Sequence, residues 1–188
     1  RAVIRCDMAA DATGIGRTMD LIVTMTGTGG QASHNGQIWR AAVGRGGIAE
    51  KRAEGDGISP TGCWPIRRVL YRPDRLDGPP VSPFPTATIE PMDGWCDAPA
   101  DPEYNRPVKR PFPASHEEMW REDGLYDIVV VLGHNDDPVV PGAGSAVFLH
   151  IARPDYSPTA GCAALCRADL LEFLAQAGPE TRLCFQAG

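Results

Sequence analysis

The chain has 188 residues, 43% of them hydrophobic, which is enough apolar side chain for one folded domain with a buried core. Its formal net charge is −6, and acidic and basic residues are interspersed, so we expect no basic face of the kind that binds nucleic acid. The longest strongly apolar run, 128–132, has the length of a buried strand. Such a run is far too short to span a membrane.

Glycine and proline divide the chain into short segments, with 21 Gly and 18 Pro, as is typical of a strand-rich fold. We therefore predict a mainly β fold with short helices, of the α+β class, built on one curved, mixed sheet. The strands are expected where β-branched or bulky apolar residues gather. In chain order these segments are 21–26, 38–43, 66–71, 87–91, 126–132 and 146–151.

Two short helices are predicted. The first, 117–122, follows Ser115, and Ser115 and Glu118 have the spacing of a capping box. The second, 167–176, ends at the stop signal Gly178-Pro179. Its apolar face is predicted to consist of Leu170, Leu171 and Leu174.

A histidine and a cysteine near the end of the chain are the candidates for chemistry. His150 ends an apolar strand, and Cys162 directly follows Gly161. A cysteine attacks a carbonyl as thiolate, so it needs a proton acceptor and N–H donors for the oxyanion. His150 is the candidate base, and the turn at Gly161 can aim N–H groups at a substrate. Because the 167–176 helix follows, its positive end would favour the thiolate. The pair predicts cysteine-based acyl transfer.

His150 alone would more simply be a structural residue at a strand end. Alternation along the strand places it on the same face as Phe148, with Val147 and Leu149 on the opposite face. The Gly-Cys turn twelve positions later shifts the interpretation of His150 toward catalysis.

The six cysteines are too scattered for a zinc-finger pattern. Cys162 and Cys166 are the close pair, and with His150 they supply three candidate ligands, but no fourth ligand stands at the usual spacing. We expect neither a metal nor another cofactor.

These motifs resemble the catalytic domain of the L,D-transpeptidases, the YkuD-like family that remodels bacterial peptidoglycan. The family's signature is a histidine after an apolar strand and then a Ser/Thr-x-Gly-Cys turn, which His150 and Thr159-Ala160-Gly161-Cys162 match. Upstream, 56–62 resembles the family's Thr-Pro-x-Gly segment. The resemblance covers about residues 20–185. It implies one catalytic domain over 1–188, with a curved mixed β-sheet or sandwich and a helix after the cysteine turn.

Further blocks are similar to a proteobacterial branch of the family. That branch includes enzymes that join L-Ala of one stem peptide to diaminopimelate of another, beside enzymes that join two diaminopimelates. Many family members carry His before the Gly-Cys pair and Arg two residues after the cysteine, where this chain has Ala160 and Ala164. These departures favour the L-Ala donor. The similar blocks are 71–75, 93–97, 104–106, 120–123, 125–127 and 153–157.

The resemblance implies that Cys162 forms a thioester, that His150 moves protons, and that Gly161 shapes the oxyanion turn. It makes peptidoglycan stem peptides the partners and the periplasm the expected location, although no export signal is visible in this chain. In an exported protein, Cys63 and Cys96 are a candidate disulfide pair.

The substrate-binding candidates lie around this turn. Arg153 and Tyr156 stand between base and nucleophile, where they can bind the carboxylates and the flank of a stem peptide; Tyr156 can instead anchor the loop. His134 follows an apolar strand and is equally compatible with a cleft or a solvated turn. Thr159 and Ala160, in the turn itself, complete the set.

Two other functions stay open. A hydrolase on the same scaffold, cutting stem peptides or releasing wall-attached protein, would use the same residues. A wall-binding module without catalysis is the second alternative, and the intact cysteine and histidine argue against it. Trp95 and Trp120 are expected in the core, and His34 at the surface.

Overall fold

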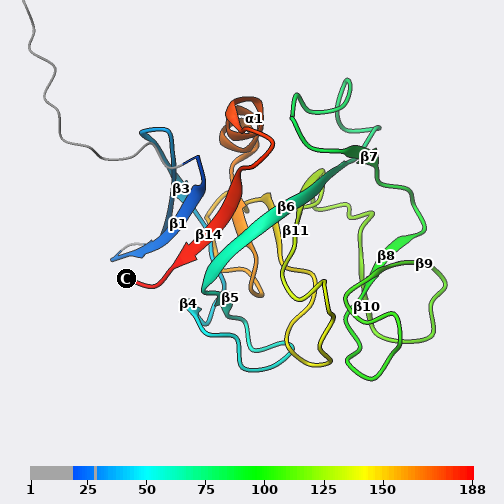
Figure 1. Ribbon diagram of the computed structural model, residues 1–188. Coiled ribbons are helices and arrows are strands. Elements are labelled where there is room, and N and C mark those ends of the chain that lie inside the picture. Colours follow the sequence, from blue (N-terminus) through cyan, green and yellow to red (C-terminus); the bar gives the residue numbers. More distant parts are fainter. Residues whose placement is uncertain (1–18, 28) are drawn as a thin grey trace, which may run out of the picture.

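The computed structural model describes residues 19–27 and 29–188 (Figure 1). Within this range, eight strands follow one another across a curved, mixed sheet in the order β13-β12-β11-β6-β14-β1-β2-β3, and β7 pairs with β6. The strands of this sheet are β1 (Leu21–Thr26), β2 (Gly29–His34), β3 (Gln37–Ala41), β6 (Gly62–Tyr71), β7 (Thr86–Thr88), β11 (Ile128–Leu132), β12 (Phe148–Ile151), β13 (Ala163–Leu165) and β14 (Arg182–Gln186).

The two ends of the large sheet meet. Ala42, just after β3, pairs with Ala164 of β13, with N to O distances of 2.8 and 2.9 Å in the two directions. The sheet is therefore nearly closed, which confirms the predicted mainly β fold with one curved mixed sheet. Two smaller sheets pack beside it. They consist of β8 (Asp93–Cys96), β9 (Pro107–Lys109) and β10 (His116–Glu118), and of β4 (Ile48–Ala49) and β5 (Ser59–Pro60).

The predicted strands are largely confirmed. The first coincides with β1, and four others overlap β3, β6, β11 and β12 with shifted ends. The 87–91 segment contributes only its first two residues to β7. Strand β2 escapes prediction because its sequence, GGQASH, holds no β-branched or large apolar side chain, and it is extended because it pairs with β1 and β3.

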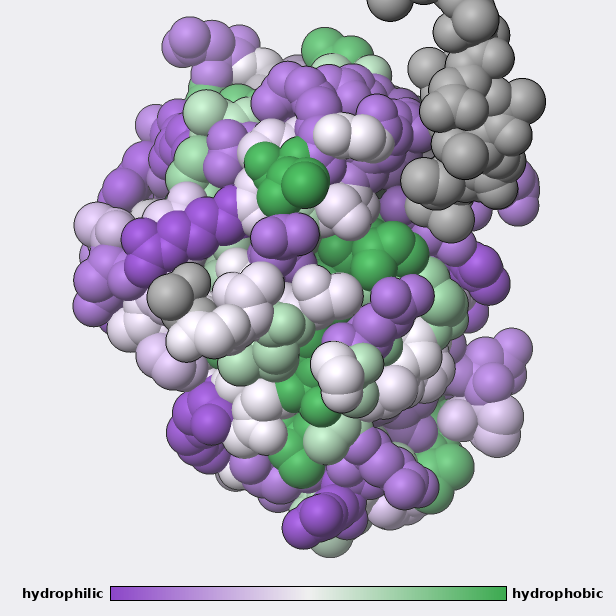
Figure 2. Space-filling view, turned by 90° about the vertical axis from the view of Figure 1, so that its left-hand side faces the viewer, coloured by the Kyte–Doolittle hydropathy of each residue, from purple (hydrophilic) through white to green (hydrophobic). Residues whose placement is uncertain are grey.

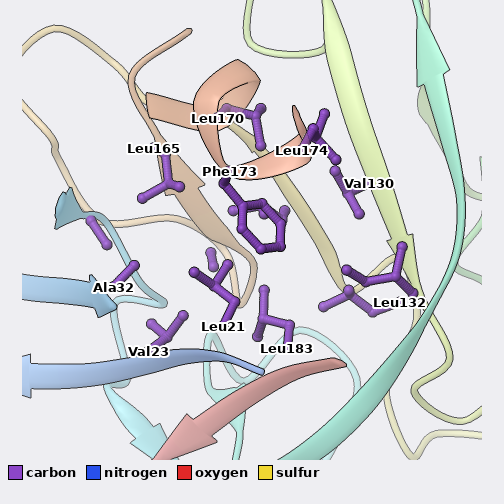
Figure 3. Packing of buried hydrophobic residues seen from close by; sticks show 14 of the residues in the cluster. Leu21, Val23, Ala32, Val130, Leu132, Leu165, Leu170, Phe173, Leu174 and Leu183 are labelled. Atoms are coloured by element: carbon purple, nitrogen blue, oxygen red, sulfur yellow. The ribbon is translucent and has the colours of Figure 1, made fainter. Parts of the chain in front are cut away.

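The main core lies between the large sheet and α1 (Arg167–Gln176), whose bounds are those predicted. Figure 3 shows Phe173 of α1 amid side chains from β1 and β14, among them Leu21 and Leu183. Leu170 and Leu174 are fully buried with Phe173, whereas Leu171 is half-buried. His34, expected at the surface, is instead 2% exposed, with its ring edge against Phe173.

A second core lies on the other face of β11 and β12, against the β8, β9 and β10 sheet. Val129, Val131 and Phe148 point into it, together with Trp95 and Met119. The predicted alternation is thus confirmed, because Val147 and Leu149 belong to the main core. Trp95 is buried and Trp120 packs against this second core, as expected.

The predicted helix over 117–122 is wrong. Residues His116–Glu118 form β10, whose Glu117 lies opposite Trp95 of β8. Two backbone hydrogen bonds flank this pairing, from Asp97 N to Ser115 O at 3.2 Å and from Met119 N to Asp93 O at 3.0 Å. A six-residue helix cannot repay its nucleation cost, so pairing with β8 overrides the capping-box pattern.

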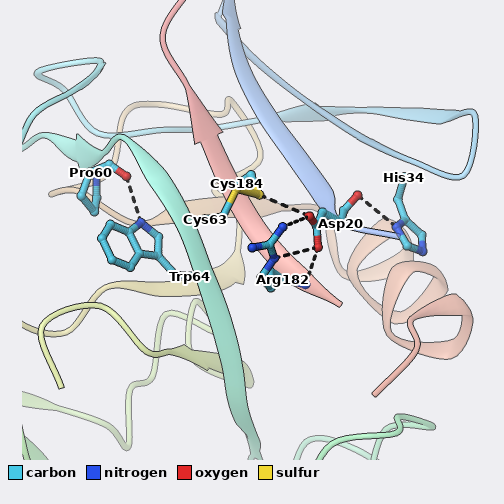
Figure 4. The surroundings of a disulfide bond; sticks show 7 residues. All are labelled: Asp20, His34, Pro60, Cys63, Trp64, Arg182 and Cys184. Atoms are coloured by element: carbon cyan, nitrogen blue, oxygen red, sulfur yellow. Dashed lines mark hydrogen bonds and ion pairs between the residues drawn. A yellow bond between two sulfur atoms is a disulfide. The ribbon is translucent and has the colours of Figure 1, made fainter. Parts of the chain in front are cut away.

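The disulfide joins Cys63 of β6 to Cys184 of β14, so the predicted Cys63–Cys96 pair is wrong (Figure 4). The two cysteines face each other directly in the antiparallel pairing of these strands. Cys96 is a buried free thiol on β8. Beside the disulfide, Asp20 forms an ion pair with Arg182 at 2.6 Å.

The surface drawn in Figure 2 shows small hydrophobic patches surrounded by hydrophilic residues. Within the described residues, no helix has the length and apolar content needed to cross a membrane.

Candidate functional site

Cys162 and His150 line one cleft of about 470 Å³. They come from neighbouring parallel strands: β12 contributes His150, and Cys162 immediately precedes β13. The register pairs His150 with Ala164 of β13. Cys162 lies two residues before Ala164 in the chain, so its side chain points to the same face of the sheet as that of Ala164. The sheet therefore brings the two residues that the sequence singled out into one cavity.

The backbone orients the imidazole of His150. Its Nδ1 lies 2.9 Å from the Ile151 carbonyl oxygen, so Nδ1 donates the proton and Nε2 keeps a free lone pair. The Tyr126 ring packs against the imidazole, with centroids 5.2 Å apart. Burial lowers the pKa of His150 to about 4, so the imidazole is neutral at pH 7.

The thiol of Cys162 is held between two backbone groups. Its Sγ donates to Ala146 O at 3.2 Å and accepts from Phe148 N at 3.4 Å. The pKa of Cys162 is raised to about 12, mainly by burial and also by the charge of Glu117, while the Phe148 N–H and Lys51 act in the opposite direction. The expected helix effect does not reach this thiol, because β13 separates Cys162 from α1.

The turn before Cys162 requires glycine. Gly161 has φ +139°, and a Cβ atom there would lie 2.9 Å from the Ile58 carbonyl oxygen. Thr159 Oγ1 accepts from Gly161 N at 3.1 Å and donates to Cys162 O at 2.7 Å. Ser59 Oγ also donates to Cys162 O, at 3.1 Å. Because the Gly161 N–H is occupied, Gly161 serves the turn by its conformation.

The next residue offers a candidate oxyanion donor. Among the described residues, the N–H of Cys162 has no hydrogen-bond partner. A free N–H beside the sulfur is the geometry that stabilises the oxyanion of a carbonyl under attack.

We expect Gly161→Ala to lower the free energy of unfolding by about 3 kcal/mol, because it adds a clash to a positive φ. Urea unfolding followed by circular dichroism measures this. Gly142→Ala is the control: its φ is +79° and its Cβ would meet nothing within 4 Å. The control should lose about 1 kcal/mol, and equal losses in the two variants would contradict the role of the Ile58 contact.

Of the substrate-binding candidates predicted from the sequence, three line the cleft and two do not. Arg153, Thr159 and Ala160 line the cleft. Tyr156 is not among the lining residues: the Arg40 guanidinium stacks over its ring at 4.2 Å from the centroid, which fits the anchoring alternative. His134 is buried against Trp64, with centroids 4.7 Å apart, and is neither in the cleft nor in a solvated turn.

The 56–62 segment lies behind the cysteine turn and supports it. Asp56 forms a buried ion pair with Lys51, whose Nζ lies 2.8 Å from Oδ1 of Asp56. Burial by itself would raise the pKa of Asp56. The Lys51 ammonium and three backbone N–H groups outweigh this effect and hold that pKa far below its usual range. Ile58 and Ser59 then reach the turn through the contacts described above. The 56–62 segment thus supports the backbone around Cys162.

The cleft also contains residues that the sequence did not single out, among them Glu117 and Tyr126. The hydroxyl of Tyr126 donates to Glu117 Oε2. Glu117 lies on β10 and not on the predicted helix, and because the sequence of β10, HEE, has no alternation of apolar and polar residues, no local signal marks it as a strand.

A family model identifies the domain: YkuD, the L,D-transpeptidase catalytic domain, matches residues 28–183. The chain belongs to this family. The resemblance to the family is therefore confirmed, and with it the assignment to the peptidoglycan enzymes of the L,D-transpeptidase type, whereas the proteobacterial branch stays a prediction. Comparisons with curated proteins and with solved structures found no matching chain.

Proposed function

We propose that the protein is a peptidoglycan L,D-transpeptidase, with Cys162 as nucleophile and His150 as proton carrier, in one catalytic domain over about residues 20–185. One observation carries the proposal: in a domain of this family, the buried thiol and an imidazole with a free Nε2 line the same cleft. The substrates are stem peptides of peptidoglycan.

The first half-reaction forms a thioester. As Sγ of Cys162 attacks the carbonyl carbon of an L-residue, the thiol proton passes to Nε2 of His150. The Cys162 N–H stabilises the oxyanion of the tetrahedral intermediate. The intermediate then expels the amine, which takes the proton from His150. Since thiol and imidazole are both neutral at rest, proton transfer accompanies the attack.

The second half-reaction transfers the acyl group. The side-chain amine of diaminopimelate on a second stem attacks the thioester, His150 accepts its proton, and the Cys162 thiol is regenerated with that proton. Water in place of the amine gives hydrolysis.

The donor that we favour is L-Ala. Ala164 lines the cleft opposite His150, where many family members carry arginine. The alanine removes a positive charge that could bind a charged donor residue such as diaminopimelate. A small, uncharged donor residue suits this wall better.

We place the protein in the periplasm, where its substrates are. The Cys63–Cys184 disulfide supports this location, because such bonds persist in oxidising compartments.

The test is incubation with purified disaccharide peptides and mass spectrometry of products and protein. Cross-linked dimers and a thioester mass on Cys162 are expected, and the acyl mass identifies the donor. Shortened stems without dimers would establish the hydrolase instead. Binding to the wall without turnover would establish a binding module.

We expect alkylation of Cys162 in the resting protein to rise with pH well beyond neutrality, because burial places its pKa at about 12. The rate of iodoacetamide labelling between pH 5 and pH 10, followed by mass spectrometry, measures this, with Cys166 as an internal reference thiol that is half-buried. A labelling plateau near pH 7 would reveal a resting thiolate and imidazolium pair and contradict the neutral pair described here.

A further inference from the structure

We propose that Glu117 is a specificity residue that binds the ammonium group of the diamino acid in the substrate, an inference that rests on the proposed function. The residue lies in the cleft with Cys162 and His150. Its carboxylate takes no part in the reaction steps derived above. Its position and its unmet charge are the grounds for the proposal.

The position is set by β10. Glu117 is half-buried on that strand, and Tyr126, which donates to its Oε2, also packs against the imidazole of His150. A cation bound to Glu117 is therefore separated from His150 by the Tyr126 side chain. The neighbouring Glu118 is exposed, forms an ion pair with Arg110 and does not line this cleft.

The carboxylate is only half satisfied. Among the described residues, Oε1 of Glu117 has no hydrogen-bond partner, and the carboxylate makes no salt bridge. The nearby Arg121 directs its guanidinium to Asp123 instead, with Nε 3.0 Å from Oδ1. Glu117 is half-buried, so Oε1 stays open to the cleft, where a cationic group that enters can bind it.

A carboxylate without a cation is unfavourable at this place. Burial raises the pKa of Glu117, and the charge of Glu117 raises the pKa of the Cys162 thiol. A neutral glutamine would accept the Tyr126 hydrogen bond without either effect. The ammonium of an arriving acceptor stem offsets both effects, and it loses one proton to solvent before it attacks the thioester as the neutral amine.

The opposite charge stands in the same cleft. Arg153 lines it, is exposed and has no ion-pair partner within the described part of the chain. Diaminopimelate ends in an ammonium and a carboxylate on one carbon. Glu117 and Arg153 complement these two groups, which fits an end group that carries both charges.

The test is equilibrium binding of free meso-diaminopimelic acid, measured by calorimetry on the parent protein, Glu117→Gln and the matched control Glu118→Gln. Pimelic acid, which lacks both amines, is the comparison ligand. We expect Glu117→Gln to weaken diaminopimelic acid binding about tenfold, with no loss for pimelic acid and no change in the control. Equal affinities in all three proteins, an equal loss for both ligands, or no binding to the parent would overturn the proposal.

A second measurement separates this proposal from the proposed function. In the disaccharide peptide assay, Glu117→Gln should keep the thioester on Cys162 and shift its fate from dimers toward hydrolysis, whereas a merely structural defect would lower the thioester as well. A parent protein that forms no thioester overturns the proposed function, and the binding measurement still decides the role of Glu117 independently.

Discussion

Cys162→Ser is expected to abolish both cross-linked product and covalent intermediate, with a loss of turnover on the order of 10⁴-fold or more. Serine keeps the size of the side chain, but a neutral imidazole whose pKa is about 4 cannot readily take a proton from its hydroxyl. Chromatography of muropeptide products and mass spectrometry of the intact protein measure the two effects.

The control for this variant is Cys166→Ser. Cys166 is the N-cap of α1 and makes no side-chain cap hydrogen bond, so serine there leaves the cleft unchanged and suits the helix start. Full activity is expected. Turnover by Cys162→Ser near that of the parent would remove Cys162 from the role of nucleophile.

Cys63→Ala with Cys184→Ala is expected to lower the free energy of unfolding by about 2 to 5 kcal/mol. The cysteines are 121 residues apart, so the bond closes a long loop in the unfolded chain. It also joins β6 and β14 in the middle of the large sheet. Urea unfolding of the parent protein and of the double variant, both without reductant, measures the difference.

Reductant supplies the control for the disulfide. It should destabilise the parent protein by a similar amount and leave the double variant unchanged. A parent protein whose unfolding midpoint is the same with and without reductant would show that the bond contributes nothing to stability.

The elements predicted from local sequence patterns were mostly correct. The β-branched and bulky apolar residues of 21–26 and the stop signal after 167–176 depend on neighbouring residues alone, and β1 and α1 were correctly placed. Where partners far along the chain decide, the prediction was wrong. Residues 116–118 form a strand and not the start of a helix because β8 pairs with them, and the partner of Cys63 is Cys184 because β14 lies beside β6.

The candidate site divides in the same way. The sequence by itself determined the family and singled out Cys162 and His150 as candidates, because their spacing and flanking residues form a local motif. The tertiary structure alone decided that Glu117 lines the cleft, that Tyr156 and His134 lie outside it, and that burial lowers the pKa of His150 and raises that of Cys162. The reason is that burial and charge at a site depend on segments distant in sequence, which only the packing of the sheets brings together.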